Sequence, residues 1–233
     1  MKRTDFLFLL YFVLLFLPFI VIPGLRDFYT RFNAEHPVLI SFIKFSLLAT
    51  TGELIGLRIK TGSYFKEGFG LLPRALIWGF LGVTVKIAFT VFATGTPVFL
   101  EMAGLDGARE IIHGPLSAQK IFVSFCISTA LNLFYAPVLM TFHKITDTHI
   151  QQHNGSFSCL FKSIRIREII VNMDWAVQWN FVLKKTIPLF WIPAQTITFL
   201  LPAEVQILFA ALLGVLLGVL LAVAAIMGNN NQS

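Results

Sequence analysis

The chain has 233 residues, of which 56% are hydrophobic and only 13% are charged, and its mean hydropathy is +0.78. This composition is typical of a membrane protein and argues against an ordinary soluble domain. The formal net charge is +6, but the basic residues are scattered along the connections, so nucleic acid is not an expected partner. Cys126 and Cys159 have neither metal-site spacing nor the number needed for a disulfide framework.

Six hydrophobic segments are predicted, each about as long as a helix that crosses a bilayer. They cover residues 6–23, 38–59, 75–94, 121–142, 186–202 and 205–227. The fold class is therefore all-α, a polytopic transmembrane bundle of about six helices. The first segment contains prolines and lacks the small-residue cleavage site of a signal peptide, so we expect it to be retained. Residues 1–35 form an additional helix with its connection, 36–227 the bundle, and 228–233 a polar tail.

The second segment, 38–59, contains two charged residues, Lys44 and Glu53. Lys44 lies near one end of the segment, where a lysine side chain can extend to the membrane surface. Glu53 is half a helical turn out of phase with Lys44, so the two side chains point to opposite sides and cannot pair. We therefore expect Glu53 to face another helix.

The third segment, 75–94, carries Lys86 well inside it, from where a lysine side chain cannot easily reach either membrane surface. Gly79, Gly82, Lys86 and Thr90 recur at helical spacing and share one face. The glycines allow another helix to approach closely beside the charge. We therefore expect Lys86 to face protein or water.

The fourth segment, 121–142, has a polar stripe on an otherwise apolar helix, formed by Ser124, Ser128, Asn132 and Tyr135. One interpretation is that this stripe and the Lys86 face line a hydrated path through the bundle. The other is that these groups only join helices by hydrogen bonds, each worth about 0.6 to 2 kcal/mol. Both interpretations stay open at this point.

The connection between the fourth and fifth segments contains an amphipathic pattern. Its apolar residues recur at spacings of three and four: Ile166, Ile169, Ile170, Met173 and Val177. Two tryptophans, Trp175 and Trp179, lie at the end of this pattern. This pattern predicts a helix in the membrane interface, with the tryptophans at headgroup depth. The alternative is a helix packed on the protein's own loops.

The fifth and sixth segments contain the stretch "FWIPAQTITFLLPAEVQ", in which Trp191, Gln195, Phe199 and Pro202 stand out. Their order resembles the carboxy-terminal motif of the Mpv/PMP family, integral membrane proteins of peroxisomes and the mitochondrial inner membrane. Thr198 stands where that family has asparagine, and the resemblance extends loosely over residues 36–225. It implies a small helical bundle without catalytic machinery that acts as a pore or influences solute balance.

Two further features of these segments have direct physical interpretations. Prolines at 188, 193 and 202 interrupt backbone hydrogen bonding, and Gln195 and Thr198 can satisfy the carbonyl groups that are freed. Gly214 and Gly218 form a small-xxx-small pattern, which indicates close packing within the chain or, alternatively, with a second copy in a homo-oligomer.

Orientation follows from the basic residues, which are concentrated at the amino terminus and in the connections around 58–74 and 144–167. Because positively charged connections stay on the cytoplasmic side, both termini are predicted to be cytoplasmic. No organelle address is recognised, so the default residence is a bacterial inner membrane, or an organelle membrane in a eukaryote.

Catalytic and metal motifs were also considered. His143, Asp147, His149 and His153 suggest a metal site, but a solvated loop is the stronger interpretation, and no cofactor is expected. The spacing of Ser117 and Lys120 is catalytic only by chance. We therefore expect a channel or solute-permeation protein and not an enzyme, embedded in the lipid bilayer, with Glu53, Lys86, Asn132 and Gln195 in its polar interior. The alternative is a noncatalytic scaffold or assembly factor, and no motif identifies a solute.

Overall fold

The computed structural model describes residues 3–230, with side chains up to Val219, and the described part consists of helices and their connections, without strands. The chain divides into two compact units, residues up to Ile40 and residues from Ser41 onward. The sequence-based boundary between 35 and 36 falls a few residues earlier, just before α4 begins at Pro37.

The described part of unit 1 contains α1 (Arg3–Phe16), α2 (Pro18–Val21), α3 (Leu25–Glu35) and the first residues of α4. Residues Arg3–Val21 are long and apolar enough to cross a membrane, and none of their side chains is buried. Gly24 turns the chain with a positive φ of 79°, a conformation that favours glycine, before the polar helix α3. An exposed helix of this hydropathy requires lipid or another apolar surface around it.

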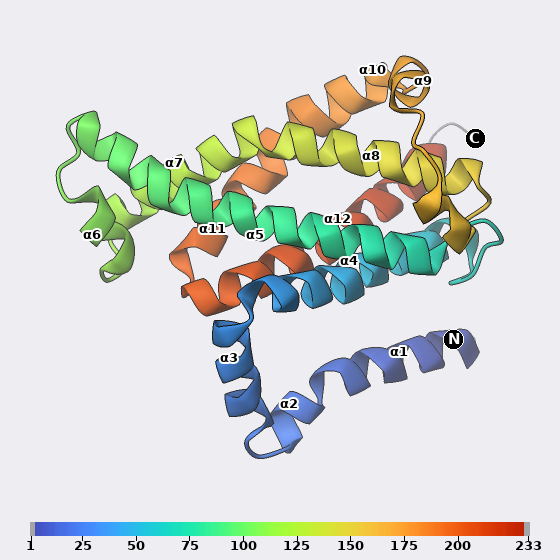
Figure 1. Ribbon diagram of the computed structural model, residues 1–233, viewed down its shortest axis with the longest axis horizontal. Coiled ribbons are helices and arrows are strands. Elements are labelled where there is room, and N and C mark those ends of the chain that lie inside the picture. Colours follow the sequence, from blue (N-terminus) through green and yellow to red (C-terminus); the bar gives the residue numbers. More distant parts are fainter. Residues whose placement is uncertain (1–2, 231–233) are drawn as a thin grey trace. The chain divides into compact units, whose positions relative to one another are not determined.

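Unit 2 consists of long helices joined by short ones. In chain order these are α4 (Pro37–Thr61), α5 (Leu71–Met102), α6 (Ala108–His113), α7 (Ala118–Phe134), α8 (Ala136–Gln152), η1 (Phe157–Phe161), α9 (Ile166–Val171), α10 (Trp175–Val177), the π-helical segment η2 (Gln178–Trp191), α11 (Ile192–Leu200) and α12 (Ala203–Asn230). The long helices of unit 2 run alongside one another between two ends (Figure 1). One end, the basic end, carries the connections 62–70 and 153–165, and the other, the α6 end, carries α6 and the turn between α11 and α12.

The number of membrane spans can be compared with the six predicted segments. In the described part, Arg3–Val21, Pro37–Thr61 and Leu71–Met102 are long and apolar enough to cross a membrane, and α7 with α8 makes a fourth if this pair is one span bent by 42°. The bend lies at Tyr135, just before Pro137, which lacks an N–H for the helix ladder. The six-span count therefore stays a prediction.

Glycines set the distance between neighbouring helices of unit 2. A Cβ built on Gly82 would lie 2.7 Å from the Ser41 carbonyl oxygen, so α4 and α5 approach closely there. A Cβ on Gly218 would lie 3.3 Å from the Gly52 carbonyl oxygen, which places α12 against α4. The predicted packing glycine Gly79 meets the Phe42 ring, whereas Gly214 has open space around its Cβ position.

The amphipathic segment after residue 165 forms two short helices, α9 and α10. Ile169 and Met173 are buried with Ile145 of α8 in one apolar cluster. Ile166 and Val171 are exposed. One face of α9 therefore packs on the protein itself, and the other remains available to a membrane interface.

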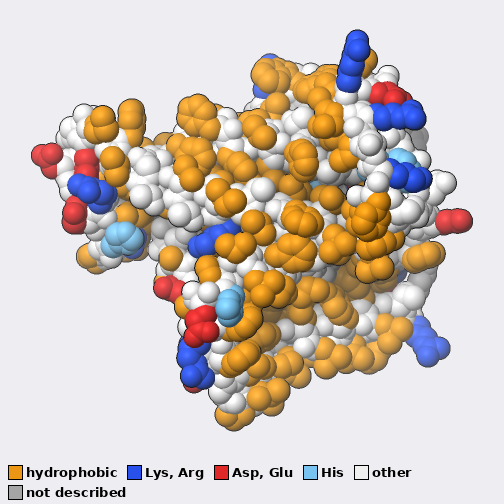
Figure 2. Space-filling model, in the orientation of Figure 1, with side chains coloured by type: hydrophobic (Ala, Val, Ile, Leu, Met, Phe, Trp, Pro, Cys, Tyr) orange, Lys and Arg blue, Asp and Glu red, His pale blue; other side chains and the backbone are white. Residues whose placement is uncertain are grey.

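The surface of unit 2 matches a membrane environment. Figure 2 shows hydrophobic side chains over the long helices on the face in view, with charged side chains gathered mainly toward the two ends. Large apolar residues of α5 and α7 are exposed, including Phe99 and Phe134. An apolar surface of this kind marks contact with lipid or with another protein. Together with the helices that are long and apolar enough to cross a membrane, it is consistent with a helical membrane protein.

Candidate functional site: two cavities in the helical bundle

The first cavity lies inside unit 2 and has a volume of about 750 Å³. Its outer end is lined by exposed polar residues of the basic end, among them Lys66, Glu67 and Asn154. Its inner end is lined by apolar side chains in the middle of the bundle, among them Phe45, Phe89 and Leu131. A pocket of this size can hold a small organic molecule.

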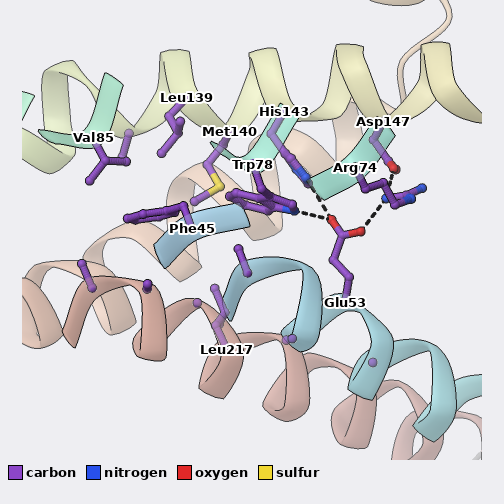
Figure 3. Close-up of a pocket in the computed structure, with 18 of the residues that line it drawn as sticks. Phe45, Glu53, Arg74, Trp78, Val85, Leu139, Met140, His143, Asp147 and Leu217 are labelled. Atoms are coloured by element: carbon purple, nitrogen blue, oxygen red, sulfur yellow. Dashed lines mark hydrogen bonds and ion pairs between the residues drawn. The ribbon is translucent and has the colours of Figure 1, made fainter. Parts of the chain in front are cut away.

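Five side chains in the outer half form the Glu53 cluster, which consists of Glu53, Arg74, Trp78, His143 and Asp147 (Figure 3). Glu53 Oε2 accepts from Arg74 Nη1 at 2.7 Å, and Glu53 Oε1 accepts from Trp78 Nε1 at 2.8 Å. His143 Nε2 lies 3.2 Å from Glu53 Oε1. Arg74 also forms an ion pair with Asp147. The cluster thus connects α4, α5 and α8.

Helical spacing explains why these residues meet. Arg74 and Trp78 lie one turn apart on α5, and His143 and Asp147 lie one turn apart on α8. The Arg74 guanidinium is fixed further by its Nε, which donates to the Phe69 carbonyl at 2.6 Å. The Trp78 and His143 rings pack with centroids 4.3 Å apart.

The Glu53 cluster contains more carboxylates than guanidinium groups. Two carboxylates, Glu53 and Asp147, surround one guanidinium that is 8% exposed, which leaves a net negative charge. The His143 ring lies against Glu53, with Nε2 3.2 Å from Glu53 Oε1. Buried charges are tolerated when each is paired and hydrogen bonded, so this cluster holds three helices together while remaining hydrated from the outer end.

The inner end of the cavity has polar groups of a different kind. Asn132 is bonded within its own helix, since its Nδ2 donates to the Ser128 carbonyl at 2.9 Å. The Tyr135 hydroxyl lies 2.7 Å from the Thr84 hydroxyl. Gln195 Oε1 and Trp191 Nε1 are buried and have no hydrogen-bond partner among the described residues. Both residues line the cavity.

The residues predicted to line a path therefore separate into two groups. Glu53, Asn132, Tyr135 and Gln195 line the first cavity. Ser124, Ser128 and Thr198 are fully buried between helices and do not line it. Ser128 Oγ donates to the Ile192 carbonyl at 2.7 Å and so joins α7 to α11, which is the helix-joining role considered as the alternative.

Lys86 lines a second cavity of about 770 Å³, which lies toward the α6 end of unit 2. Thr90, Arg109 and Glu110 line it too. Among the described side chains, the Lys86 ammonium makes no hydrogen bond or ion pair, and it is not beside Glu53. Lys44, which is 7% exposed, lies near enough for its charge to interact with that of Lys86.

Phe89 lines both cavities. Its side chain is 4% exposed, and its ring packs on that of Phe199, which is 3% exposed, with centroids 5.0 Å apart. On α12 the lining changes within one turn, from Ile207 in the second cavity to Ala210 in the first. The two cavities are thus separated by about one layer of side chains.

The other motifs considered in the sequence have structural positions. His149 Nε2 lies 2.9 Å from the Cys159 carbonyl oxygen, and His153 Nδ1 lies 2.9 Å from the His149 carbonyl oxygen. In the part of the chain searched for metal sites, no group of three His, Cys, Asp or Glu residues could hold an ion. Ser117 Oγ accepts from the Lys120 backbone N–H and caps α7.

The partners of Glu53 were not predicted from the sequence. Arg74 entered the sequence analysis only as one of the basic residues of the connection around 58–74, and His143 and Asp147 only as possible metal ligands. Their signal was spacing: a polar pair one turn apart on each of two helices, Arg74 with Trp78 and His143 with Asp147. Comparison of the chain with protein-family models, curated proteins and solved structures gave no match.

Proposed function

We propose that this protein is an integral membrane protein that permits a small solute to cross the bilayer through the two cavities. The observation that carries the proposal is that one buried side chain, Phe89, lines a cavity reaching from the basic end and another lying toward the α6 end. An apolar constriction between two hydrated vestibules blocks conduction when it is dry. Phe89 and Phe199 form such a constriction.

The proposed topology has six crossings: α1 with α2, α4, α5, α7 with α8, η2 with α11, and α12. The lengths and hydropathy of three or four of these support it, and an even number of crossings returns both termini to one side. The basic connections 62–70 and 153–165 share one end of unit 2 (Figure 1), which supports a cytoplasmic basic end. In this arrangement α9 lies at the cytoplasmic interface.

We also propose a family and a membrane of residence for this protein. Trp191, Gln195 and Phe199 support divergent membership of the Mpv/PMP family, and a bacterial inner membrane is the proposed default. Gly218 packs on Gly52 of the same chain, so this glycine is used internally, and a homo-oligomer would need another surface.

The test is solute efflux from sealed vesicles that contain the purified protein. Phe89→Ala should raise the efflux rate severalfold, because the truncation opens the layer between the cavities. Phe99→Ala is the matched control, since Phe99 lies on the same helix, is 65% exposed and lines neither cavity. Thermal unfolding of each variant checks that the fold is kept, because truncating a buried phenylalanine costs about 3–5 kcal/mol.

Lys86→Met tests the second cavity in the same vesicles. Removal of the lysine charge that the described lining of this cavity contains should change the relative rates of charged and neutral solutes. Vesicles that stay equally tight with wild type, Phe89→Ala and Lys86→Met would contradict permeation and favour the noncatalytic scaffold or assembly factor.

A further inference from the structure

Among the described side chains, none that is charged lines the inner end of the first cavity. The charged residues that line the cavity all lie toward its outer end: Glu53, Lys60, Lys66, Glu67, Arg74 and Asp147. Inside them the walls are mostly apolar, with Phe45 and Val85 projecting beyond the Glu53 cluster (Figure 3). An ion that moved inward would lose hydration without gaining a counter-charge.

Two polar atoms at this inner end lack partners in the described part of the chain, Trp191 Nε1 and Gln195 Oε1. The first can only donate a hydrogen bond and the second can only accept one. The two residues lie one turn apart, where η2 meets α11, and Gln195 is only 6% exposed. Buried polar atoms are nearly always bonded, so a donor and an acceptor left unpaired beside a cavity indicate a ligand.

Trp191 and Gln195 lie beside the inner end of the first cavity. Gln195 lies one turn before Phe199 on α11, and the Phe199 ring packs on Phe89, which closes the cavity. A molecule that enters from the basic end would therefore meet Trp191 and Gln195 before it reaches the constriction.

We propose that Trp191 and Gln195 form a binding subsite for a small uncharged solute of the polyol class. A hydroxyl oxygen of the solute accepts from Trp191 Nε1, and a hydroxyl hydrogen is donated to Gln195 Oε1. Carbon-bound hydrogens of the solute lie against Phe45, Val85 and Phe89. This inference rests on the proposed function, because it assigns a solute class to the same cavity.

The subsite disfavours a carboxylate for a specific reason. A carboxylate would require a cation or charge-assisted donors, but Trp191 and the Gln195 amide offer only neutral N–H groups, and Gln195 Oε1 would repel it. The nearest guanidinium, Arg74, is already shared by Glu53 and Asp147. The neutral polyol erythritol and its carboxylate counterpart erythronate are therefore a discriminating pair of probes.

The experiment is titration of the purified protein, with ¹⁵N-labelled tryptophan, by erythritol and by erythronate. Only the indole resonance of Trp191 should shift saturably with erythritol. Trp78 Nε1 and Trp175 Nε1 are internal controls, because they already donate to Glu53 and to the Ile170 carbonyl. Gln195→Met should weaken the apparent affinity about tenfold, a loss of about 1.4 kcal/mol, while Gln119→Met, at an exposed position outside both cavities, should not.

The outcomes separate the subsite from permeation. Equal shifts with erythronate, or none with erythritol, would overturn the subsite whatever the vesicles show. Erythritol binding that depends on Gln195, in a protein that leaves vesicles tight, would support the subsite and refute permeation. The wild-type comparison of the two probes decides the matter even if Gln195→Met fails to fold.

Discussion

The outer and inner ends of the first cavity use polar groups in opposite ways. At the outer end Glu53 has hydrogen bonds or ion pairs from three residues on two other helices. At the inner end Trp191 Nε1 and Gln195 Oε1 are buried without a partner. Satisfied polar groups hold helices together, whereas buried unsatisfied ones disfavour folding and remain available to a solute.

The largest effect on stability is expected for Glu53→Leu. It leaves the Trp78 N–H and the His143 ring without their acceptor and reduces the Arg74 guanidinium to a single carboxylate partner. We expect a loss of about 3 kcal/mol in the free energy of unfolding, at the lower end for a broken buried pair because Glu53 keeps some exposure. Thermal unfolding in lipid-detergent micelles measures this loss.

Glu67→Leu is the control for that substitution, because Glu67 is an exposed carboxylate at the mouth of the same cavity. It should change stability by less than about 0.5 kcal/mol. If the two leucine variants unfold at the same temperature, the outer cluster does not hold α4, α5 and α8 together.

The next largest loss of stability is expected for Gly82→Ala. This substitution tests the close packing of α4 on α5, which brings Glu53 to its partners. The new Cβ would lie 2.5 Å from the Phe45 Cβ and 2.7 Å from the Ser41 carbonyl oxygen, so α4 and α5 must separate. We expect a loss of about 2 kcal/mol from overpacking. Gly95→Ala on the same helix, with nothing within 4 Å of its Cβ position, should instead stabilise by about 0.5 kcal/mol or more. If Gly82→Ala leaves the free energy of unfolding unchanged, α4 and α5 do not pack closely at this position.

The smallest expected change in stability compares a hydrogen-bonded side chain on α7, Ser128, with an unpaired one on α11, Gln195. Ser128→Ala removes the bond to the Ile192 carbonyl and should cost about 0.6 kcal/mol. Gln195→Met removes no bond made by Oε1, so stability should stay the same or rise. Equilibrium unfolding of both variants decides this, and a larger loss for Gln195→Met would mean that Oε1 has a partner in the folded protein.

Much of the fold could be predicted from the sequence because hydrophobic length is a local property. The runs around Lys44, Lys86 and Ser124 were recognised as helices, and the face of Gly79 and Gly82 predicted a close helix approach. The break at Tyr135 and the π-helical stretch through Pro188 were not predicted, because they depend on how freed backbone groups are satisfied by neighbours.

The candidate site was harder to predict, for a physical reason. Glu53 was expected to face another helix, but choosing among Lys86, Arg74 and His143 as partner requires the rotation of each helix about its axis. That rotation is set by packing, which one helix alone does not determine. Lys86 and Glu53 were therefore assigned to one polar interior, although they line different cavities.

The most direct test of the central claim is access to each cavity from one side of a sealed vesicle. In a protein with Cys126 and Cys159 replaced by serine, Tyr135→Cys reports on the first cavity and Thr94→Cys on the second. Ser63→Cys and Arg109→Cys mark the basic end and the α6 end. A membrane-impermeant thiol reagent should label Tyr135→Cys only from the side that labels Ser63→Cys, and Thr94→Cys only from the side that labels Arg109→Cys. Labelling of both cavity positions from the same side, or of neither, would contradict a path that joins opposite faces of the membrane at Phe89.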